Sequence, residues 1–202
     1  MIKIISLNDD YVVCLKPVGL SSQDDGMGKE LAKQLSSEIY CVHRLDKAVS
    51  GLMVFARNKK TAALLSGNIT NKHYLAVVEN KDLPDEDEFN DLLYHDKNRN
   101  KSYVVKRERK GVKDAKLRYK VVGRKDDLCL VDVELFTGRT HQIRVQFASR
   151  KMPLLGDGKY GSKVNCDIAL FSCSLSFKDP VSNELLAFKT EAEDIYPFNL
   201  FN

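Results

Sequence analysis

Residues Cys41–Arg57 read CVHRLDKAVSGLMVFAR, and this stretch decides which fold and which site we expect. Its single carboxylate, Asp46, has three basic neighbours in the sequence: His43, Arg44 and Lys47. The apolar run Leu52–Ala56 follows at once and is typical of a buried strand. An acid at the mouth of a buried strand, among basic side chains, is expected to stay ionised and to work beside a negatively charged partner.

The rest of the chain alternates between strand patterns and helix patterns. One hairpin is expected from Ile2–Leu7 and Tyr11–Leu15, and another from Ala169–Phe177 and Leu185–Lys189. The other expected strands are Leu52–Ala56, Tyr74–Val78, Lys101–Lys106, Ala115–Val122 and Leu128–Phe136. The expected helices are Gly28–Ser37, Lys59–Ser66 and Thr140–Arg150. The expected loops and turns are Lys81–Glu88, Gly123–Asp127 and Pro153–Gly161. This mixture predicts one α+β domain over residues 1–202.

Length and composition are those of an ordinary globular protein. The chain has 202 residues, 43% of them hydrophobic and 30% charged, which is enough to bury a core without disulfides or metals. No run reaches the ~20 apolar residues of a membrane span, and the amino terminus lacks a signal-peptide pattern. The five cysteines have no C-x-x-C spacing. We expect a cytoplasmic protein, monomeric and away from membranes.

The charges are unevenly distributed along the chain. Asp82–Asp91 holds six acids and no base, whereas Lys97–Lys120 holds eleven lysines and arginines against two acids. A basic block that also contains Tyr103 and Tyr119 is typical of a surface that binds a polyanion. A solvated pair of strands with alternating lysines explains the same block equally well.

The common catalytic patterns are missing from the sequence. The four histidines lack the spacing of metal ligands, and there is no G-x-S-x-G nucleophile elbow. There is no P-loop, and the G-x-G-x-x-G spelling at Gly156–Gly161 follows an expected helix and not a strand. The acidic run Asp85–Glu88 is a candidate metal site by composition alone, and a solvated loop is the simpler explanation.

Five short motifs remain after these exclusions. They are KPVGL at Lys16–Leu20, HRLDKAVSGL at His43–Leu52, KHYLAVV at Lys72–Val78, TGRTHQIRV at Thr137–Val145 and PLLGDGKYG at Pro153–Gly161. In this order and at these distances, the chain resembles the RluA-type family of RNA pseudouridine synthases. The resemblance runs from about Asp9 to Glu193.

The resemblance implies a fold, a reaction and a partner. The fold is the pseudouridine synthase fold, with a mixed, largely antiparallel sheet, flanking helices and a central RNA-binding cleft. The reaction is the isomerisation of uridine to pseudouridine in structured rRNA or tRNA, in which uracil is detached at nitrogen one, turned and rejoined through carbon five. No net redox change or hydrolysis occurs, so no cofactor or metal is expected, and the partner is RNA and not DNA.

The resemblance also assigns roles to individual residues. Asp46 matches the catalytic aspartate, and Arg144 matches the arginine that pairs with it. Tyr74 matches the pocket tyrosine that lies against the uracil and assists proton transfer from carbon five. Ile143 matches an apolar residue of the pocket wall, and Arg44 matches an arginine that fills the gap left by the flipped base.

Physical chemistry agrees with these roles. Burial raises the pKa of a carboxyl group and an arginine partner lowers it, so Arg144 is expected to keep Asp46 ionised. A carboxylate is needed whether Asp46 attacks the anomeric carbon or removes a proton from the ribose. The base must flip out at a cost of roughly a few kcal/mol, and stacking on Tyr74 returns about 1–3 kcal/mol. Arg139 and the basic block are expected to contact phosphates, and Lys16 with its loop is expected to be structural.

The chain departs from the family pattern in several places, of which three bear on the site and its RNA. Val49 stands where threonine is usual, and Ser66–Lys72 is shorter than usual by about one helical turn. The catalytic pattern begins almost at once, so we expect no amino-terminal RNA-binding domain. Two other functions stay open: an RNA chaperone that kept the fold and lost turnover, and a metal-dependent phosphoesterase that uses Asp85–Glu88. Without the family pattern, Asp46 would be an ordinary turn acid paired with a neighbouring lysine.

Overall fold

The computed structural model describes residues 1–79, 82–192 and 194–201, and the chain divides into two compact units. Unit 1 comprises Met1–Lys72 and Phe171–Ala192, and unit 2 comprises His73–Leu170 and Glu193–Asn202. The organisation of residues 1–202 as a single catalytic domain stays a prediction. In the part of the chain that the structure describes, no helix is both long enough and apolar enough to cross a bilayer.

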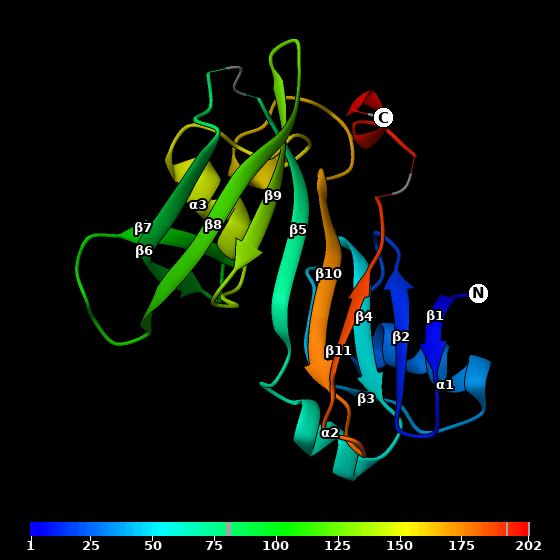
Figure 1. The fold of residues 1–202 in the computed structure, drawn as a ribbon. Helices are drawn as coiled ribbons and strands as arrows, with labels where there is room; N and C mark the ends of the chain where they lie inside the picture. Colours follow the sequence, from blue (N-terminus) through cyan, green and yellow to red (C-terminus); the bar gives the residue numbers. More distant parts are fainter. Residues whose placement is uncertain (80–81, 193, 202) are drawn as a thin grey trace. The chain divides into compact units, whose positions relative to one another are not determined.

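Unit 1 is built on a mixed sheet. Strands β1 (Lys3–Leu7), β2 (Tyr11–Lys16) and β4 (Ser50–Ala56) pair antiparallel in that order, and β10 (Leu170–Lys178) pairs parallel to β4 (Figure 1). Two further short strands join this sheet: β3 (Tyr40–Cys41) pairs with β4, and β11 (Leu185–Lys189) pairs with β10. Both hairpins expected from the sequence are confirmed.

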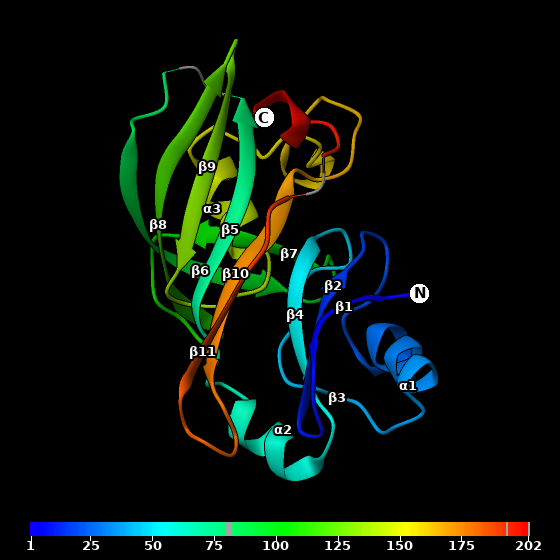
Figure 2. The same ribbon diagram turned by 45° about the vertical axis from the view of Figure 1, so that its right-hand side comes forward.

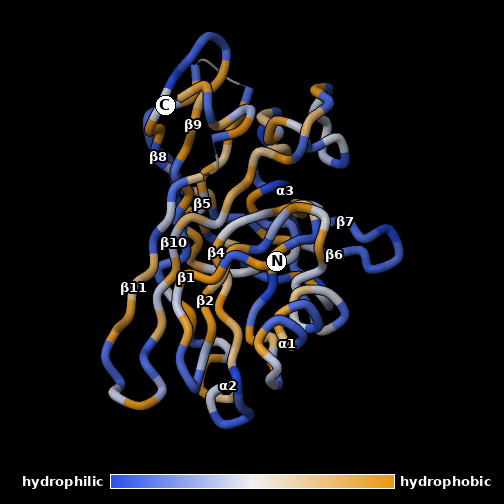
Figure 3. The backbone as a smooth tube through the Cα atoms, turned by 90° about the vertical axis from the view of Figure 1, so that its right-hand side faces the viewer, coloured by the Kyte–Doolittle hydropathy of each residue, from blue (hydrophilic) through white to orange (hydrophobic). Residues whose placement is uncertain are grey.

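The helices of unit 1 lie against this sheet and its loops. Helix α1 (Lys29–Leu35) is tied to β1 because Gln34 exchanges hydrogen bonds with the backbone of Ile2, at 2.8 and 3.0 Å (Figure 2). Helix α2 (Lys59–Leu65) starts at Asn58, whose side chain accepts from the Thr61 N–H. The core residues come from strands that are hydrophobic along most of their length (Figure 3): Val13, Leu52, Val54, Leu175 and Phe177.

Unit 2 contains the second part of the sheet and one helix. Its strands run in the order β5 (Thr70–Glu79), β9 (Leu128–Leu135), β8 (Val112–Lys125), β6 (Glu86–Asp96) and β7 (Lys101–Val105). The β8–β9, β6–β8 and β6–β7 pairs are antiparallel. Helix α3 (Gln142–Ser149) packs on this sheet, where Gln146 Nε2 donates to the backbone carbonyls of Phe89 and Ala115 at 3.3 Å. The prediction of an α+β fold with a largely antiparallel sheet is confirmed.

Strand β6 was missed by the sequence analysis, which placed an exposed loop at Lys81–Glu88. Lys81 lies outside the described residues, but Glu86–Glu88 already belong to β6, so the loop prediction is wrong there. The reason is that three acids, Glu86–Glu88, precede the first buried position, Phe89, so the start of the strand shows no apolar alternation. Those acids face bases across the strand pair, with Glu88 opposite Arg118 in the register.

The start of helix α3 also differs from the expectation. Thr140 was expected to cap the helix, but the N-cap is His141, which has a left-handed backbone with φ of 56°. The helix therefore begins at Gln142 and ends at Ser149. The expected loop Pro153–Gly161 is confirmed, and it contains one short helical turn at Gly158–Tyr160.

Candidate active site

Asp46 lies on the loop between β3 and β4, within unit 1. The loop turns tightly there, because the backbone N–H of Val49 donates to the Asp46 carbonyl at 3.0 Å. Val49, which replaces the usual threonine, is only 2% exposed and holds the turn through its backbone. The side chain of Asp46 is half-buried at this turn.

Lys16, the last residue of β2, braces the Asp46 loop from beneath. Its ammonium group is buried and donates to three backbone carbonyls: Pro17 (2.7 Å), Leu20 (2.8 Å) and Lys47 (3.2 Å). The Gly19 N–H also donates to the Lys47 carbonyl, at 2.8 Å. Burial lowers the pKa of Lys16 to about 8, and the negative charge of Asp46 opposes that change. Lys16 therefore stays cationic at neutral pH and ties two loops together next to the carboxylate.

His43 is held as a neutral imidazole beside the same loop. Its Nε2 accepts a hydrogen bond from the backbone N–H of Val54 in β4 at 3.1 Å, so its proton is on Nδ1. Removal of the ring from water, together with the positive charge of Lys72, lowers the pKa of His43 to about 4. His43 thus anchors the loop to β4 and is uncharged at neutral pH.

The lowered pKa of His43 predicts a loss of stability in acid. A histidine in the unfolded chain has a pKa of about 6.5, so between pH ~6.5 and ~4 the unfolded state binds more protons than the folded state. Stability therefore falls as the pH drops through this window, by up to about 3 kcal/mol. In urea denaturation across this window, we expect the free energy of unfolding to depend on pH more steeply in wild type than in His43→Asn. The difference in slope should correspond to the uptake of about one proton on unfolding. Equal slopes for the two proteins would contradict this assignment.

Arg44 follows His43 and is exposed on the surface of unit 1. It lines an open hollow together with Gln23, Asp25 and the residues that precede it on the loop. An arginine that contacts RNA needs such exposure, so the position of Arg44 is compatible with its predicted role.

In unit 2, side-chain hydrogen bonds fix the turn that leads into helix α3. Thr137 Oγ1 donates to Gln142 Oε1 at 2.8 Å, and Gln142 Nε2 donates to the carbonyl of Lys116 in β8 at 3.1 Å. The backbone N–H of Arg139 also donates to Gln142 Oε1, at 3.0 Å. Arg139 itself is half-buried, with its Nε bonded to the Asp114 carbonyl at 2.8 Å. These bonds explain why the TGRTHQIRV motif needs Thr and Gln at these positions.

The first turn of α3 buries Ile143 and Arg144, which are 4% and 5% exposed. The guanidinium of Arg144 forms two hydrogen bonds with the carboxylate of Asp157: Nε to Oδ2 at 2.7 Å and Nη2 to Oδ1 at 2.9 Å. The ring of Tyr160 lies against the same guanidinium, with 5.2 Å between the Arg144 Cζ and the ring centroid. Two residues of unit 2 therefore hold Arg144, and neither was expected from the sequence to do so.

Tyr74 lies at the middle of β5 and is 8% exposed. It shares one face of the strand with Ala76 and Val78, which are fully buried. The preceding residue, His73, is fixed by a contact between its Nδ1 and Asp132 Oδ1 in β9, at 2.8 Å. Although Ser66–Lys72 is shorter than usual in the family, Tyr74 therefore sits on a regular strand.

Bases of strand β8 partly neutralise the acidic run within unit 2. Asp85 pairs with Arg124 at 2.7 Å, and Glu88 pairs with Lys116 at 2.8 Å. No cluster of three or more His, Cys, Asp or Glu side chains able to hold a metal occurs among the described residues. This pairing gives the run an ordinary structural role and offers no support to the phosphoesterase hypothesis.

The comparison with known families decides the identity. The model of the RNA pseudouridylate synthase family matches residues 10–149, which include Asp46, Tyr74 and Arg144. The chain belongs to this family. The prediction of an enzyme that modifies RNA, and of the isomerase class, is thereby confirmed. The pseudouridine synthase fold is likewise confirmed.

Relatives and solved structures agree with the family match. A Bacillus subtilis protein named uncharacterized RNA pseudouridine synthase YhcT is 32% identical, over 98% of this chain and 70% of its own length. A Haemophilus influenzae protein, named as an uncharacterized RNA pseudouridine synthase, is 31% identical over 79% of this chain and 74% of its own. A solved structure of human RNA Pseudouridylate Synthase Domain Containing 4 has the same fold. Its TM-score is 0.81 and its identity 22%, over 98% of this chain and 91% of that one.

The predicted site residues are divided between the two units. Unit 1 carries Asp46 and Arg44, and unit 2 carries the others: Tyr74, Arg139, Ile143 and Arg144. Their joint action on one uridine stays a prediction. The sequence analysis missed Asp157 and Tyr160, although both lie in the PLLGDGKYG motif. The available signal was their place in a motif that carries the resemblance.

Proposed function

We propose that this protein isomerises uridine to pseudouridine at specific positions of structured RNA, either rRNA or tRNA, in the cytoplasm. The observation that carries the proposal is the family match over residues 10–149, in which Asp46, Tyr74 and Arg144 are all present. The proposal includes a monomeric enzyme that needs no cofactor, because the reaction only rearranges one nucleotide. In that rearrangement the bond from nitrogen one to the ribose breaks, and a bond from carbon five forms. Carbon five then gives up its proton and nitrogen one gains one.

In the proposed mechanism, Asp46 is the carboxylate that acts on the ribose. Its loop is well suited to this task, since Lys16 and His43 fix the backbone on both sides of it. A catalytic group held by such a scaffold needs no rearrangement when the substrate arrives. His43 is neutral and the ammonium group of Lys16 is bonded to backbone carbonyls, so neither residue transfers a proton in this mechanism.

Tyr74 and Arg144 are proposed to act on the same uridine from unit 2. Tyr74 would lie against the flipped uracil and assist the loss of the proton from carbon five. Arg144 would balance the negative charge of Asp46 in a pocket without water, which protects the detached uracil from hydrolysis. Ile143, which precedes Arg144 in the sequence and is also buried, would form part of the apolar wall of the pocket.

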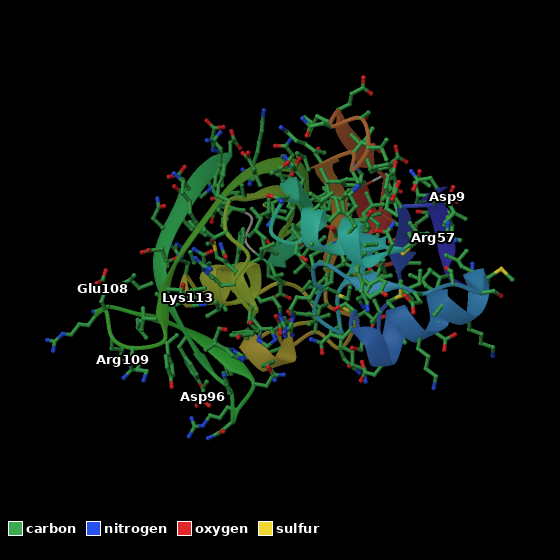
Figure 4. The ribbon with its side chains drawn as sticks, turned by 90° about the horizontal axis from the view of Figure 1, so that it is seen from below. Asp9, Arg57, Asp96, Glu108, Arg109 and Lys113 are labelled. Carbon is green, nitrogen blue, oxygen red and sulfur yellow. The ribbon has the colours of Figure 1, made fainter. Side chains whose placement is uncertain are left out.

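The RNA outside the pocket is proposed to bind to basic residues. Arg44 would fill the space left by the flipped base, and Arg139 would contact a phosphate. The loop after β7 adds further positive charge, and Figure 4 shows Arg109 and Glu108 at this loop. The guanidinium of Arg109 lies over the ring of Tyr94, 4.6 Å from its centroid, which holds part of the loop in place.

Tritium release tests the proposed activity and its independence of metals. RNA labelled with tritium at carbon five of uracil should release label when mixed with wild-type protein, because that proton leaves during isomerisation. We expect release from an rRNA or a tRNA pool and none from DNA, with rates unchanged by EDTA. Release that stops with EDTA would contradict the mechanism. RNA binding without release from any pool would favour the RNA-chaperone hypothesis instead.

A further inference from the structure

Arg144 and Asp157 form an ion pair that is almost wholly removed from water. The two side chains are 6% and 0% exposed, and both hydrogen bonds are short and parallel, at 2.7 and 2.9 Å. Such side-on pairing fixes the plane of a guanidinium as well as its position. A buried ion pair adds little net stability compared with apolar residues of the same volume, so its geometry calls for a second explanation.

The turn that carries Asp157 is rigid. Its backbone carbonyl accepts from the N–H groups of Tyr160 at 3.0 Å and Ser162 at 3.1 Å. Gly156, with φ of 78°, lies so close to the backbone of Asp167 that a Cβ there would be 2.4 Å from the carbonyl oxygen. The carboxylate is therefore presented to Arg144 from a hydrogen-bonded turn that packs closely against the backbone of Asp167.

Tyr160 restrains the other side of the guanidinium. Its hydroxyl accepts from the backbone N–H of Ser102 in β7 at 2.8 Å and contacts His141 Nδ1 at 3.0 Å. Ser102 Oγ donates to the Thr140 carbonyl at 2.6 Å, which ties the same strand to the residue before the helix cap. The ring is thus fixed at its polar end while its face lies 5.2 Å from Arg144.

We propose that Asp157 is a positioning residue that fixes the guanidinium of Arg144 for uridine isomerisation, with the ring of Tyr160 as the second restraint. The inference rests on the proposed function, and it assigns to the PLLGDGKYG loop a part in catalysis. Asp157 acts only through Arg144 and does not touch the reacting nucleotide. The orientation of Arg144 is then set inside unit 2, before RNA binds.

Helix α3 supplies a matched control for this proposal. Arg150, six residues after Arg144, pairs with Asp91 at 2.9 Å and stacks on Phe89 at 3.8 Å. This second Asp–Arg pair joins the C-cap of the same helix to β6 and is partly exposed, with 30% for Arg150 and 12% for Asp91. It anchors α3 to β6, so Asp91→Asn measures how far a weaker attachment of the helix lowers the rate of tritium release.

The experiment compares Asp157→Asn with Asp91→Asn under single-turnover conditions. For each full-length protein, we measure tritium release from labelled RNA, RNA affinity and thermal unfolding. We expect Asp157→Asn to lower the rate by about 10²-fold, as a displacement of about 1 Å at a catalytic group does, with RNA affinity unchanged. Asp91→Asn is expected to keep most of the wild-type rate. Equal losses in the two variants would overturn the proposal, because helix loosening alone would then explain both.

A double-mutant cycle covers the case in which Asp157→Asn fails to fold because the buried Arg144 has lost the negative charge of Asp157. Arg144→Gln is compared with Arg144→Gln/Asp157→Asn, which removes both charges together. If Asp157 acts only through Arg144, the second change adds no further loss of rate. A further loss would overturn the proposal. Absence of release by wild type would instead refute the proposed function itself, whereas release by wild type with an intact rate in Asp157→Asn would refute only the positioning role.

Discussion

Asp46→Asn is expected to lower the rate of tritium release by at least about 10³-fold, the scale seen when the reacting group of an active site is removed. The amide has nearly the same shape as the carboxylate but carries no charge, so it neither attacks the anomeric carbon nor removes a ribose proton. The turn at Asp46 depends on its backbone carbonyl and the Val49 N–H, and both survive the substitution. Folding and RNA affinity are therefore expected to persist.

An exposed aspartate of the same unit provides the control for Asp46. Asp9 lies at the turn between β1 and β2, where it pairs with Arg57 at 3.9 Å (Figure 4). Asp9→Asn removes one negative charge from unit 1 without touching the loop of Asp46. We expect it to release tritium at the wild-type rate. A comparable loss in Asp9→Asn, or full activity in Asp46→Asn, would remove Asp46 from its catalytic role.

Lys16→Met is expected to damage both stability and turnover. Methionine fills a similar volume but donates no hydrogen bonds, so the carbonyls of Pro17, Leu20 and Lys47 each lose a buried donor. We expect the free energy of unfolding to fall by about 3 kcal/mol in urea denaturation. The loop that carries Asp46 then loses its brace, and the rate is expected to fall by about 10²-fold.

The control for Lys16 is an exposed lysine of the same unit, far in sequence from the loop of Asp46. Lys3 is exposed on β1, so Lys3→Met removes the same charge from unit 1 with little effect on stability or rate. The comparison is made below pH 8, where Lys16 is still cationic. Wild-type stability together with wild-type turnover in Lys16→Met would show that the hydrogen bonds of Lys16 to the three carbonyls are unnecessary for holding the Asp46 loop.

Local pattern was enough to predict most strands and helices, and its failures have identifiable causes. Strands with uninterrupted apolar runs, such as Ser50–Ala56, were found because burial on both faces leaves a clear signal. Glu86–Asp96 was missed because its acids are balanced by bases of Val112–Lys125, a contact between distant parts of the sequence. The His141 cap was missed because its left-handed backbone is stabilised by Tyr160, nineteen residues further on.

The candidate site shows the same division between local and distant information. Asp46, Tyr74 and Arg144 were named because they lie in motifs whose spelling is specific. The neutral state of His43 required knowledge that its Nε2 meets the Val54 N–H. The role of Asp157 required knowledge that a loop thirteen residues beyond Arg144 returns to its guanidinium. Contacts of this kind arise from the fold and leave no periodic trace in the sequence.

Nucleoside analysis of RNA after reaction with the wild-type protein tests the central claim most directly. The RNA is digested completely, and uridine, pseudouridine and free uracil are quantified by chromatography and mass spectrometry. The account predicts that pseudouridine rises by the amount that uridine falls, with no free uracil and no change in total mass. Free uracil in proportion to the uridine lost, or unchanged uridine in every rRNA and tRNA pool, would contradict it.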